Sequence, residues 1–354
     1  MSCGRSAAYH LEGLALEDGW SVLARDEATG DHTGGAYSVG YVVAQSPSGL
    51  MGYLKAFDYS EALEDVDPAR ALERLTAIYN AERELLELCG SRSLRRIVRA
   101  LAAGNVRVDG FSPNVVSFLI LELADSDSRD LRERTDPAEH MPILRLAHNA
   151  AVSISQLHSI GATHQDIKPS NFLVWMTPRG PDGKLGDLGC AHMPGRPSPF
   201  DGQVVAGDCS YASPEQLYNG QDILPTGDRR FAADMYMLGN LAMFLFTGVS
   251  HSGLLHVTLD RSLHWKNFGG SIDEVMPALV DAHGIVLGKL EPALHSDIRA
   301  EVVKLIDEMC YPDPRHRGDR VARKLGHNPF AFNRYVTRLD LLYKRAAIAG
   351  GVLV

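Results

Sequence analysis

The sequence lacks the features that mark secreted, membrane-spanning or zinc-stabilised proteins. Its five cysteines are far apart, odd in number and without a C-x-x-C pair, which argues against a disulfide framework or a zinc site and favours a reducing compartment. Residues 1–20 contain acids and no sustained apolar run, so they do not resemble a secretory signal. The most apolar stretch, from Met235 to Phe246, is too short to span a bilayer and is broken by Gly239 and Asn240. We therefore expect a cytoplasmic protein with no membrane partner.

Basic residues are not in excess either. The formal net charge is −9 and both signs are scattered along the chain, which argues against a protein that binds nucleic-acid backbones. At 45% hydrophobic and 22% charged, the chain has the composition of a globular protein with a sizeable core. There is no internal repeat or low-complexity linker, so 354 residues are compatible with one large domain or two modest ones.

The character of the chain changes near residue 124. Before it, short β-rich runs alternate with turn residues and are interrupted by one helix; after it, the pattern is mainly helical. The first part predicts strands over 20–24, 39–44, 52–57, 106–108 and 115–123, with a helix over 67–88. The second part predicts helices over 144–159, 232–247, 301–310 and 330–346. Two short strands, 171–175 and 183–185, are expected to be joined by a turn at Pro181-Asp182-Gly183.

The residues with the strongest chemical signal follow one another on predicted loops. Asp166 comes directly after a helix, Lys168 follows two residues later and Asn171 five residues later. The predicted hairpin then leads to Asp187-Leu188-Gly189. Phosphoryl transfer needs cations for the phosphates, oxygen ligands for magnesium and a group that orients the incoming hydroxyl. These loops supply all three kinds of group.

This pattern resembles the eukaryotic-like (Hanks-type) Ser/Thr protein kinases, as a divergent bacterial-type member. His164-Gln165-Asp166 with Asn171 looks like the H-R-D-x-x-x-x-N loop, and Asp187-Leu188-Gly189 looks like D-F-G. Further similarities lie downstream and upstream: Ala212-Ser213-Pro214-Glu215 resembles A-P-E, Asp234 with Leu238-Gly239 resembles the start of the helix that anchors the catalytic loop, Asp313-Pro314 with Arg317 resembles D-P-x-x-R, and Lys55 stands at the phosphate-binding lysine. The resemblance covers about residues 20–325.

The resemblance implies an α+β, bilobal protein kinase fold, with a small β-rich N-lobe carrying one helix and a larger helical C-lobe. The corresponding boundaries are 1–19 for an N-terminal extension, 20–123 for the N-lobe, 124–325 for the C-lobe and 326–354 for a C-terminal helical extension. ATP and Mg²⁺ are the implied cofactors, and a protein of unknown identity is the implied substrate. The oligomeric state is left open.

Roles carry over position by position. Asp166 would orient the substrate hydroxyl, Lys168 would neutralise the transferring phosphoryl group, and Asn171 and Asp187 would hold magnesium. Lys55 would hold the α- and β-phosphates. Its partner on the helix is expected to be Glu84, with Glu82 as the second candidate. The remaining expectations are Gly34 and Gly35 over the phosphates, backbone groups of Glu122 and Ala124 on the adenine, Leu121 as gatekeeper, and structural support from His164, Leu188, Leu88, Glu215, Asp234 and Arg317.

The chain also departs from the family pattern. Residues 33–40 form a poor glycine-rich loop, because only Gly35 and the aromatic Tyr37 are in register, and Tyr53 stands where the family has an alanine that packs over adenine. Asp208 replaces a threonine that normally binds the catalytic aspartate and lysine. It would pair with Lys168 or point to solvent.

The pattern also predicts how activity is controlled. Gln165 replaces the arginine that receives an activation-loop phosphate, and the loop 190–211 contains no threonine. We therefore expect activity that does not depend on phosphorylation of this loop.

Two other functions stay open on the sequence alone. The poor glycine-rich loop, Tyr53 and Asp208 fit a pseudokinase that serves as a nucleotide-binding scaffold. A small-molecule kinase of the aminoglycoside or choline type also uses H-x-D-x-x-x-x-N, but those enzymes lack the equivalents of Lys168 and of the Glu215–Arg317 pair. His251, His256 and His264 lie in a segment predicted as a loop, where a solvated face is favoured over a metal site.

Overall fold

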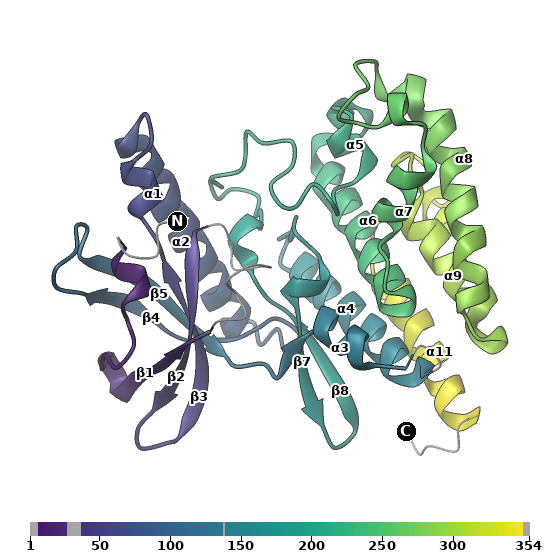
Figure 1. Ribbon diagram of the computed structural model, residues 1–354. Coiled ribbons are helices and arrows are strands. Elements are labelled where there is room, and N and C mark those ends of the chain that lie inside the picture. The colour runs from purple at the N-terminus through teal and green to yellow at the C-terminus, as the bar shows by residue number, and fades with distance from the viewer. Residues whose placement is uncertain (1–5, 27–36, 137–138, 350–354) are drawn as a thin grey trace. The chain divides into compact units, whose positions relative to one another are not determined.

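The computed structural model describes residues 6–26, 37–136 and 139–349. The chain forms two compact units (Figure 1). The first unit contains residues up to Ala124 together with the three residues Asp187–Gly189. The second contains Asp125–Gly186 and everything from Cys190 onward. The chain thus leaves the second unit briefly, places three residues in the first, and returns.

The first unit is built on a five-stranded antiparallel sheet with the order β1-β2-β3-β5-β4. The strands are β1 (Trp20–Arg25), β2 (Ser38–Gln45), β3 (Leu50–Phe57), β4 (Ala100–Arg107) and β5 (Val115–Glu122). Two helices follow β3, the short α1 (Ser60–Leu63) and the long α2 (Pro68–Ser91). Pro68 occupies the first turn of α2, where no backbone N–H is needed, and the Asp67 side chain caps the helix by accepting from the backbone N–H of Arg70.

The core of the first unit lies on one face of the sheet. Alternate residues of the interior strands point into it, among them Tyr41 and Val43 of β2 and Leu54 and Ala56 of β3. Residues before β1 pack into this core as well, and the Tyr41 hydroxyl donates a 2.7 Å hydrogen bond to the carbonyl of Ala8. The segment assigned as an N-terminal extension therefore contributes to the core of the first unit.

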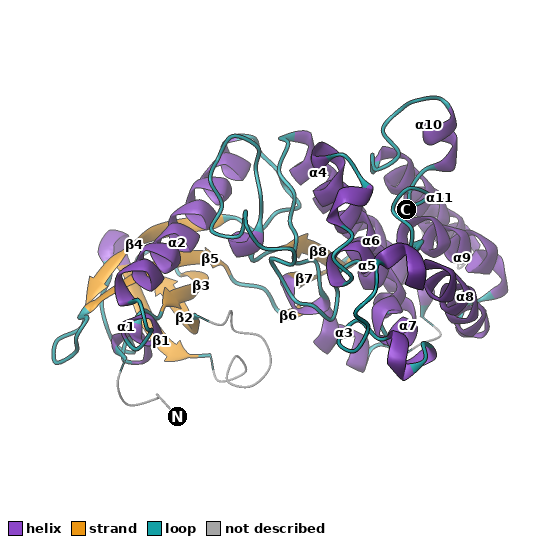
Figure 2. Ribbon diagram, turned by 90° about the horizontal axis from the view of Figure 1, so that it is seen from above, coloured by secondary structure: helices purple, strands orange, loops and turns teal. Residues whose placement is uncertain are grey.

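The second unit is mainly helical (Figure 2). Its helices are α3 (Ser128–Arg134), α4 (His140–Ser159), α5 (Pro214–Leu217), α6 (Thr226–Thr247), α7 (His251–Thr258), α8 (Ile272–Leu290), α9 (Ser296–Cys310), α10 (Arg320–Lys324) and α11 (Asn333–Ala349). A small sheet of order β6-β7-β8 is formed by β6 (Ser126–Asp127), β7 (Phe172–Thr177) and β8 (Gly180–Leu185). Helix α11 packs on α4, so the predicted C-terminal helix docks within this unit.

The predicted turn between β7 and β8 was wrong by three residues. Pro181, Asp182 and Gly183 lie inside β8, and the turn is formed by the two residues before Gly180. Proline is tolerated in β8 because this strand lies at the edge of its sheet. Glycine is needed at 183 for packing, since a Cβ there would lie 2.7 Å from Cε1 of Phe172. The same residue types thus serve an edge strand here, although they are typical of turns.

Helix α6 is buried over most of its length, as its apolar pattern predicts. Gly239 lets α9 approach closely, because a Cβ at this position would lie 2.9 Å from Cβ of Met309. In the described part of the chain, no single helix is long and apolar enough to cross a membrane. Helices α6 and α7, which are bent relative to each other, have the length and composition of a membrane-spanning segment only when they are counted together.

The segment predicted as a histidine-containing loop is folded otherwise. His251 begins α7, is fully buried and shares a 2.8 Å hydrogen bond with His283 of α8. No group of three or more His, Cys, Asp or Glu side chains with metal-binding geometry occurs among the described residues.

Candidate active site

Lys55 is the centre of an ion-pair cluster in the first unit. Its Nζ lies 2.9 Å from Oε2 of Glu82 on α2 and 2.9 Å from Oδ1 of Asp187. Burial alone would lower the pKa of Lys55, but the charges of Asp187 and Glu82 outweigh it and raise that pKa. Lys55 therefore stays protonated and is held in one position, as a lysine that binds phosphate oxygens needs to be.

The expectation that Glu84 pairs with Lys55 was wrong, and the second candidate, Glu82, fills that place. Glu82 is fully buried on the face of α2 that meets the sheet, whereas Glu84 is exposed. Two residues correspond to about 200° around a helix, so the side chains at 82 and 84 point in nearly opposite directions. Burial raises the pKa of Glu82, and the nearby Lys55 opposes that rise.

Asp166 is the centre of a second cluster, in the second unit. Its Oδ2 accepts from Nδ2 of Asn171 at 3.0 Å and lies 3.0 Å from Nζ of Lys168. Its Oδ1 accepts a 2.8 Å hydrogen bond from the backbone N–H of Asp208. Asp166 is buried, and three donors fix the orientation of its carboxylate. Lys168 and Asn171, both predicted from sequence spacing, are thus brought onto Asp166.

Asp208 contributes to this cluster through its backbone. Its carboxylate accepts a 2.8 Å hydrogen bond from the backbone N–H of Ser210, which closes a tight local turn. That turn aims the N–H of Asp208 at Asp166. The aspartate that stands in place of the family's threonine is therefore compatible with an ordered loop around Asp166.

Gly207 allows this close approach. A Cβ on Gly207 would lie 2.6 Å from Cβ and 2.7 Å from Cγ of Asp166, and closer still to Oδ1. Real Cβ atoms do not come so near to other atoms, so only glycine fits. Sequence reasoning did not single out Gly207, although it directly precedes Asp208, which the family pattern did single out.

Asp234 on α6 anchors the loop that contains His164, Gln165 and Asp166. Its two carboxylate oxygens accept 2.8 Å hydrogen bonds from the backbone N–H groups of His164 and Gln165. Gln165 has a φ of +65°, a left-handed conformation that is uncommon for a residue with a side chain. Its Nε2 donates to Asp234 and to the backbone carbonyl of Arg230, and these bonds stabilise the strained position.

His164 is fully buried beside this loop. Its Nδ1 accepts from the backbone N–H of Asp166 at 3.2 Å, and its Nε2 lies 2.9 Å from the carbonyl oxygen of Gly186. One nitrogen accepts and the other faces an acceptor, which is the pattern of a neutral imidazole protonated at Nε2. His164 therefore supports the loop and ties it to the residue that precedes Asp187.

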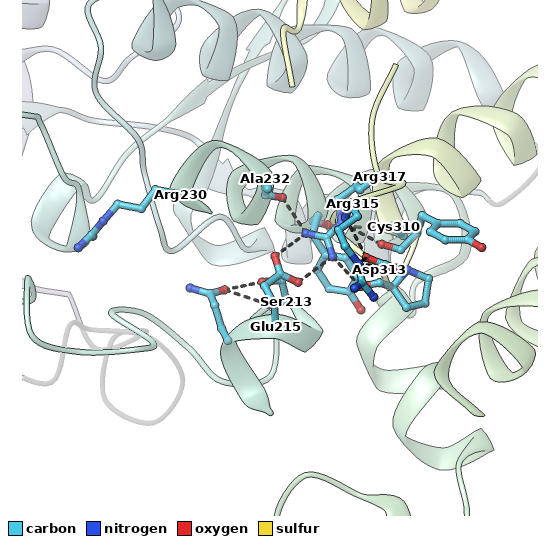
Figure 3. A network of polar contacts seen from close by, with 12 residues as sticks. Ser213, Glu215, Arg230, Ala232, Cys310, Asp313, Arg315 and Arg317 are labelled. Atoms are coloured by element: carbon cyan, nitrogen blue, oxygen red, sulfur yellow. Dashed lines mark hydrogen bonds and ion pairs between the residues drawn. The ribbon is translucent and has the colours of Figure 1, made fainter. Parts of the chain in front are cut away.

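The predicted pair of Glu215 and Arg317 forms a buried, two-pronged ion pair (Figure 3). Nη1 of Arg317 lies 2.6 Å from Oε1 of Glu215, and Nη2 lies 2.8 Å from Oε2. The same guanidinium donates to the carbonyls of Tyr311, Pro312 and Ala232. Because Arg317 is fully buried, this pair fixes the end of the segment 190–215 to α6 and to the loop after α9.

The beginning of that segment is fixed by residues that sequence reasoning missed. Backbone groups of Thr163 and His192 form a two-bond bridge beside the catalytic loop. Nδ1 of His192 lies 2.9 Å from Oδ1 of Asp201, and Nη2 of Arg230 lies 3.5 Å from the same oxygen. Burial and the neighbouring Arg230 lower the pKa of His192. These residues are distant in sequence, so no local pattern could have grouped them.

The other predicted residues lie on α2, at the end of β5 and beside Asp187, and their roles stay predictions. Leu121 and Leu188 are buried, Leu88 is half-buried, and Glu122 and Ala124 follow at the end of β5, also half-buried. The carboxylate of Glu122 accepts from the backbone N–H of Arg99. Gly34 and Gly35 lie outside the described residues. Their placement over phosphates stays a prediction.

Asp187 and Asn171 have the chemistry of magnesium ligands, since carboxylate and amide oxygens suit this ion. The Nδ2 of Asn171 donates both to the carboxylate and to the backbone carbonyl of Asp166, so the amide orientation is fixed. Asp187 has a φ of +53°, a second strained position at a proposed functional residue. Asp187 belongs to the first unit and Asn171 to the second, and each by itself offers an oxygen ligand of the kind that magnesium takes.

Comparisons with known proteins agree with this geometry. The crystal structure of a kinase domain is similar with a TM-score of 0.57 at 14% identity, covering 90% of this chain and 97% of that one, which supports the predicted α+β kinase fold. A serine/threonine-protein kinase (drp72) of Corynebacterium efficiens is 31% identical over 60% of this chain and 36% of its own length. The serine/threonine-protein kinase PknL of Mycobacterium tuberculosis is 29% identical over 37% of this chain and 31% of its own length.

The chain thus spans about a third of these curated relatives. The family model for the protein kinase domain matches residues 36–330, which include both clusters and the Glu215–Arg317 pair. This chain belongs to the protein kinase domain family.

Proposed function

We propose that the protein is a serine/threonine protein kinase that transfers the γ-phosphate of ATP to a protein hydroxyl. The observation that carries the proposal is the fixed carboxylate of Asp166. A carboxylate offers about four acceptor positions. Among the described residues, three donors approach Asp166, which leaves one position for a substrate hydroxyl.

The residues of this chain have complementary tasks. Asp166 orients the hydroxyl of the substrate and receives its proton late in the transfer. Lys168 lies 3.0 Å from the same carboxylate and is placed to neutralise the phosphoryl group that arrives at the hydroxyl. Lys55, held by Glu82, binds the α- and β-phosphates. Asn171 and Asp187 would hold magnesium, which when bound would neutralise charge on the phosphates.

Support for the serine/threonine class comes from Lys168 and from the relatives, whose names describe serine/threonine kinases. The Glu215–Arg317 pair argues against a small-molecule kinase of the aminoglycoside or choline type, because those enzymes lack this segment. A cytoplasmic location stays the prediction made from the sequence.

One experiment separates the candidate functions. The purified chain is incubated with labelled ATP and magnesium, with and without generic protein substrates, beside an Asp166→Ala variant. Incorporation into protein that disappears in the variant supports the proposal. ATP binding without transfer indicates a pseudokinase scaffold, and transfer only to small metabolites indicates the small-molecule class.

We also propose that activity does not depend on phosphorylation of the segment 190–211. The support is the carboxylate of Asp201, which lies between Nδ1 of His192 and Nη2 of Arg230. A phosphate on an activation segment works by drawing such groups together. Here an acidic side chain that is always present makes those contacts, so the segment is tied down without modification.

The test uses Asp201→Asn. Because the Asp201 side chain is 44% exposed, loss of its charge is expected to lower kcat by only about two- to fivefold. Asp222→Asn is the matched control, since Asp222 is fully exposed and pairs with Arg229, the residue next to Arg230. Ser198→Ala, Ser210→Ala and phosphatase treatment are expected to leave activity unchanged. Loss of activity in either serine variant would overturn this part of the proposal.

A further inference from the structure

A series of hydrogen-bonded side chains, the buried network, runs through the second unit to the backbone of Tyr211. Its members are, in order, Arg320, Asp307, His283, His251, Tyr236, Ser252 and Asn240. At its outer end, Nη2 of Arg320 lies 2.7 Å from Oδ2 of Asp307 on α9. Oδ1 of Asp307 lies 3.0 Å from Nε2 of His283 on α8. Arg320 and Asp307 are partly exposed, so the network begins at an ion pair that solvent reaches.

The inner members of the buried network are shielded from solvent. The side chains of His251, Tyr236, Ser252 and Asn240 are at most 1% exposed. Nδ1 of His251 lies 3.2 Å from the hydroxyl oxygen of Tyr236, which lies 3.2 Å from Oγ of Ser252. Nδ2 of Asn240 donates to Oγ of Ser252 at 3.0 Å and to the backbone carbonyl of Tyr211 at 3.2 Å. These buried polar groups are therefore satisfied within the protein.

The inner end of the buried network meets the turn that holds Asp166. The backbone N–H of Tyr211 donates to the carbonyl of Asp208 at 3.0 Å and closes this turn. The backbone N–H of Asp208 donates at 2.8 Å to the carboxylate of Asp166. Asn240 thus fixes the carbonyl of a residue whose own N–H closes the turn beside the proposed catalytic carboxylate.

One arrangement of protons satisfies every member of the buried network. An ionised carboxylate can only accept, so Asp307 accepts from Nε2 of His283. Nδ1 of His283 then accepts from Nε2 of His251, which share a distance of 2.8 Å. Nδ1 of His251 accepts from the Tyr236 hydroxyl, and the Tyr236 oxygen accepts from the Ser252 hydroxyl. Each donor therefore points toward Asp307, and both imidazoles are neutral.

The surroundings favour this arrangement. Burial opposes the ionisation of Asp307, but the hydrogen bond from His283 and the charge of Arg320 outweigh it and lower the pKa of the carboxyl. Burial, the neighbouring His283 and the charge of Arg317 lower the pKa of His251 well below its ordinary value. A charged acceptor at the outer end and a neutral imidazole in the middle are what this direction of donors requires.

The opposite direction leaves a polar group unsatisfied. A second proton on His283 would make its Nδ1 a donor and reverse the donors as far as Tyr236. Ser252 still accepts from Asn240, so the hydroxyl proton of either Ser252 or Tyr236 would have no acceptor in the described part of the chain. The carboxylate of Asp307 therefore sets the direction of each donor as far as Ser252, which receives the amide of Asn240.

We propose that Asp307, His283 and His251 are positioning residues for phosphoryl transfer. Through the buried network they hold the turn 208–211, and with it the backbone N–H that orients Asp166. The inference rests on the proposed function for the reaction that is affected. The expected effect falls on kcat and not on the KM for ATP, because the lysine proposed to bind the phosphates belongs to the other unit.

Two substitutions interrupt the buried network at different places. Tyr236→Phe removes the hydroxyl and keeps the ring that Arg317 contacts, and Asp307→Ala removes the outer acceptor. Each is expected to lower kcat about three- to tenfold, since a misplacement of about 1 Å costs on the order of 100-fold and a smaller one costs less. Asp297→Ala is the matched control, because Asp297 lies on the same helix as Asp307 and faces His295, but is exposed. It is expected to leave kcat unchanged, and thermal melting verifies that each variant is folded.

The double variant distinguishes a connected network from two separate stabilising contacts. If Asp307 acts through Tyr236, the second substitution adds little once the first is present. The double variant is then expected to lower kcat by about the same three- to tenfold as each single variant. Independent contributions would multiply to roughly 10- to 100-fold, and that result would overturn the inference.

Hydrogen exchange of the backbone amides in 208–211, measured by mass spectrometry, tests the network without the transfer reaction. The N–H groups of Asp208 and Tyr211 are hydrogen-bonded, so a loosened turn exchanges them faster. Tyr236→Phe and Asp307→Ala are expected to accelerate this exchange about three- to tenfold, and the control is not. If the unaltered chain transfers no phosphate but exchange responds in this way, the proposed function fails and the coupling of the network to the turn stands. Unchanged exchange in both variants would overturn the inference.

Discussion

The substitution Gly207→Ala would displace the carboxylate of Asp166 without replacing any charged residue. The new methyl group would lie 2.6 Å from Cβ and 2.7 Å from Cγ of Asp166. Contacts of ordinary van der Waals length begin near 3.4 Å, so one partner must move by about 0.7–0.8 Å. Asp166 cannot rotate away without losing the hydrogen bonds from Asn171 and Asp208.

The expected cost follows from that displacement. A misplacement of about 1 Å at a reacting group costs on the order of 100-fold in rate. We therefore expect Gly207→Ala to lower kcat by roughly 30- to 100-fold. The KM for ATP is expected to change by less than about threefold, because Lys55 and its two carboxylate partners belong to the other unit.

The assay is steady-state phosphorylation of a protein substrate with ATP varied, together with thermal melting. Gly202→Ala is the matched control, since Gly202 lies in the same segment and an added Cβ there meets no atom within 4 Å. It is expected to keep kcat within twofold. A Gly207→Ala variant with kcat within threefold of the unaltered chain would show that the fixed position of Asp166 is not needed for transfer.

Three further predictions concern the Lys55 cluster, the Glu215–Arg317 pair and the half-buried His256. Glu82→Gln is expected to raise the KM for ATP at least tenfold and to lower kcat, whereas Glu84→Gln, exposed on the same helix, changes neither in the same kinetic assay. Arg317→Ala strands a buried carboxylate and is expected to cost about 3–5 kcal/mol in urea unfolding, against less than about 1 kcal/mol for the more exposed Arg315→Ala. Burial lowers the pKa of His256 from 6.5 to about 4. The unfolded chain therefore binds a proton that the folded chain does not, so the free energy of unfolding falls as the pH drops from about 6.5 to 4, by roughly 1–2 kcal/mol. His256→Gln is expected to flatten that dependence in urea titrations at several pH values, and an unchanged slope would contradict the assignment.

The parts of the site that the sequence predicted are those joined by short spacings. Asp166, Lys168 and Asn171 lie within six residues, and a loop that short can bring the three side chains onto one point. Glu215 and Arg317 are 102 residues apart, yet each lies in its own recognisable motif, so their pairing could be expected. Sequence spacing alone does not determine in which direction a given side chain on a helix points. Helical periodicity placed 67–88 correctly but did not decide whether 82 or 84 faces the sheet.

Residues outside any motif could not be grouped from the sequence. His251 and His283 meet in the core through α7 and α8, and neither helix was expected. A segment with several histidines is predicted to be an exposed loop when the hydrogen-bond partners of the histidines are unknown. Burying such polar side chains is favourable only when they are hydrogen-bonded. The contacts of Asp201 with His192 and Arg230 could not be predicted for the same reason. Long-range hydrogen bonds of this kind exist only in the folded chain.

We interpret Gln165 and Asp201 together. Gln165 stands in place of the arginine that receives a phosphate in the family, and Asp201 makes the contacts that such a phosphate would make. A phosphorylated residue carries close to two negative charges and calls for more than one cation, whereas the single charge of Asp201 is matched by Arg230 alone. A lowered pKa keeps His192 neutral near pH 7, so it adds a hydrogen bond and no second charge. An arginine at 165 would set a second guanidinium beside Arg230, where Asp201 already meets Arg230 and Asp234 already accepts from the backbone N–H groups of His164 and Gln165. The neutral amide of Gln165 donates to the carbonyl of Arg230 and to Asp234, and so keeps the loop in place while leaving Arg230 to Asp201.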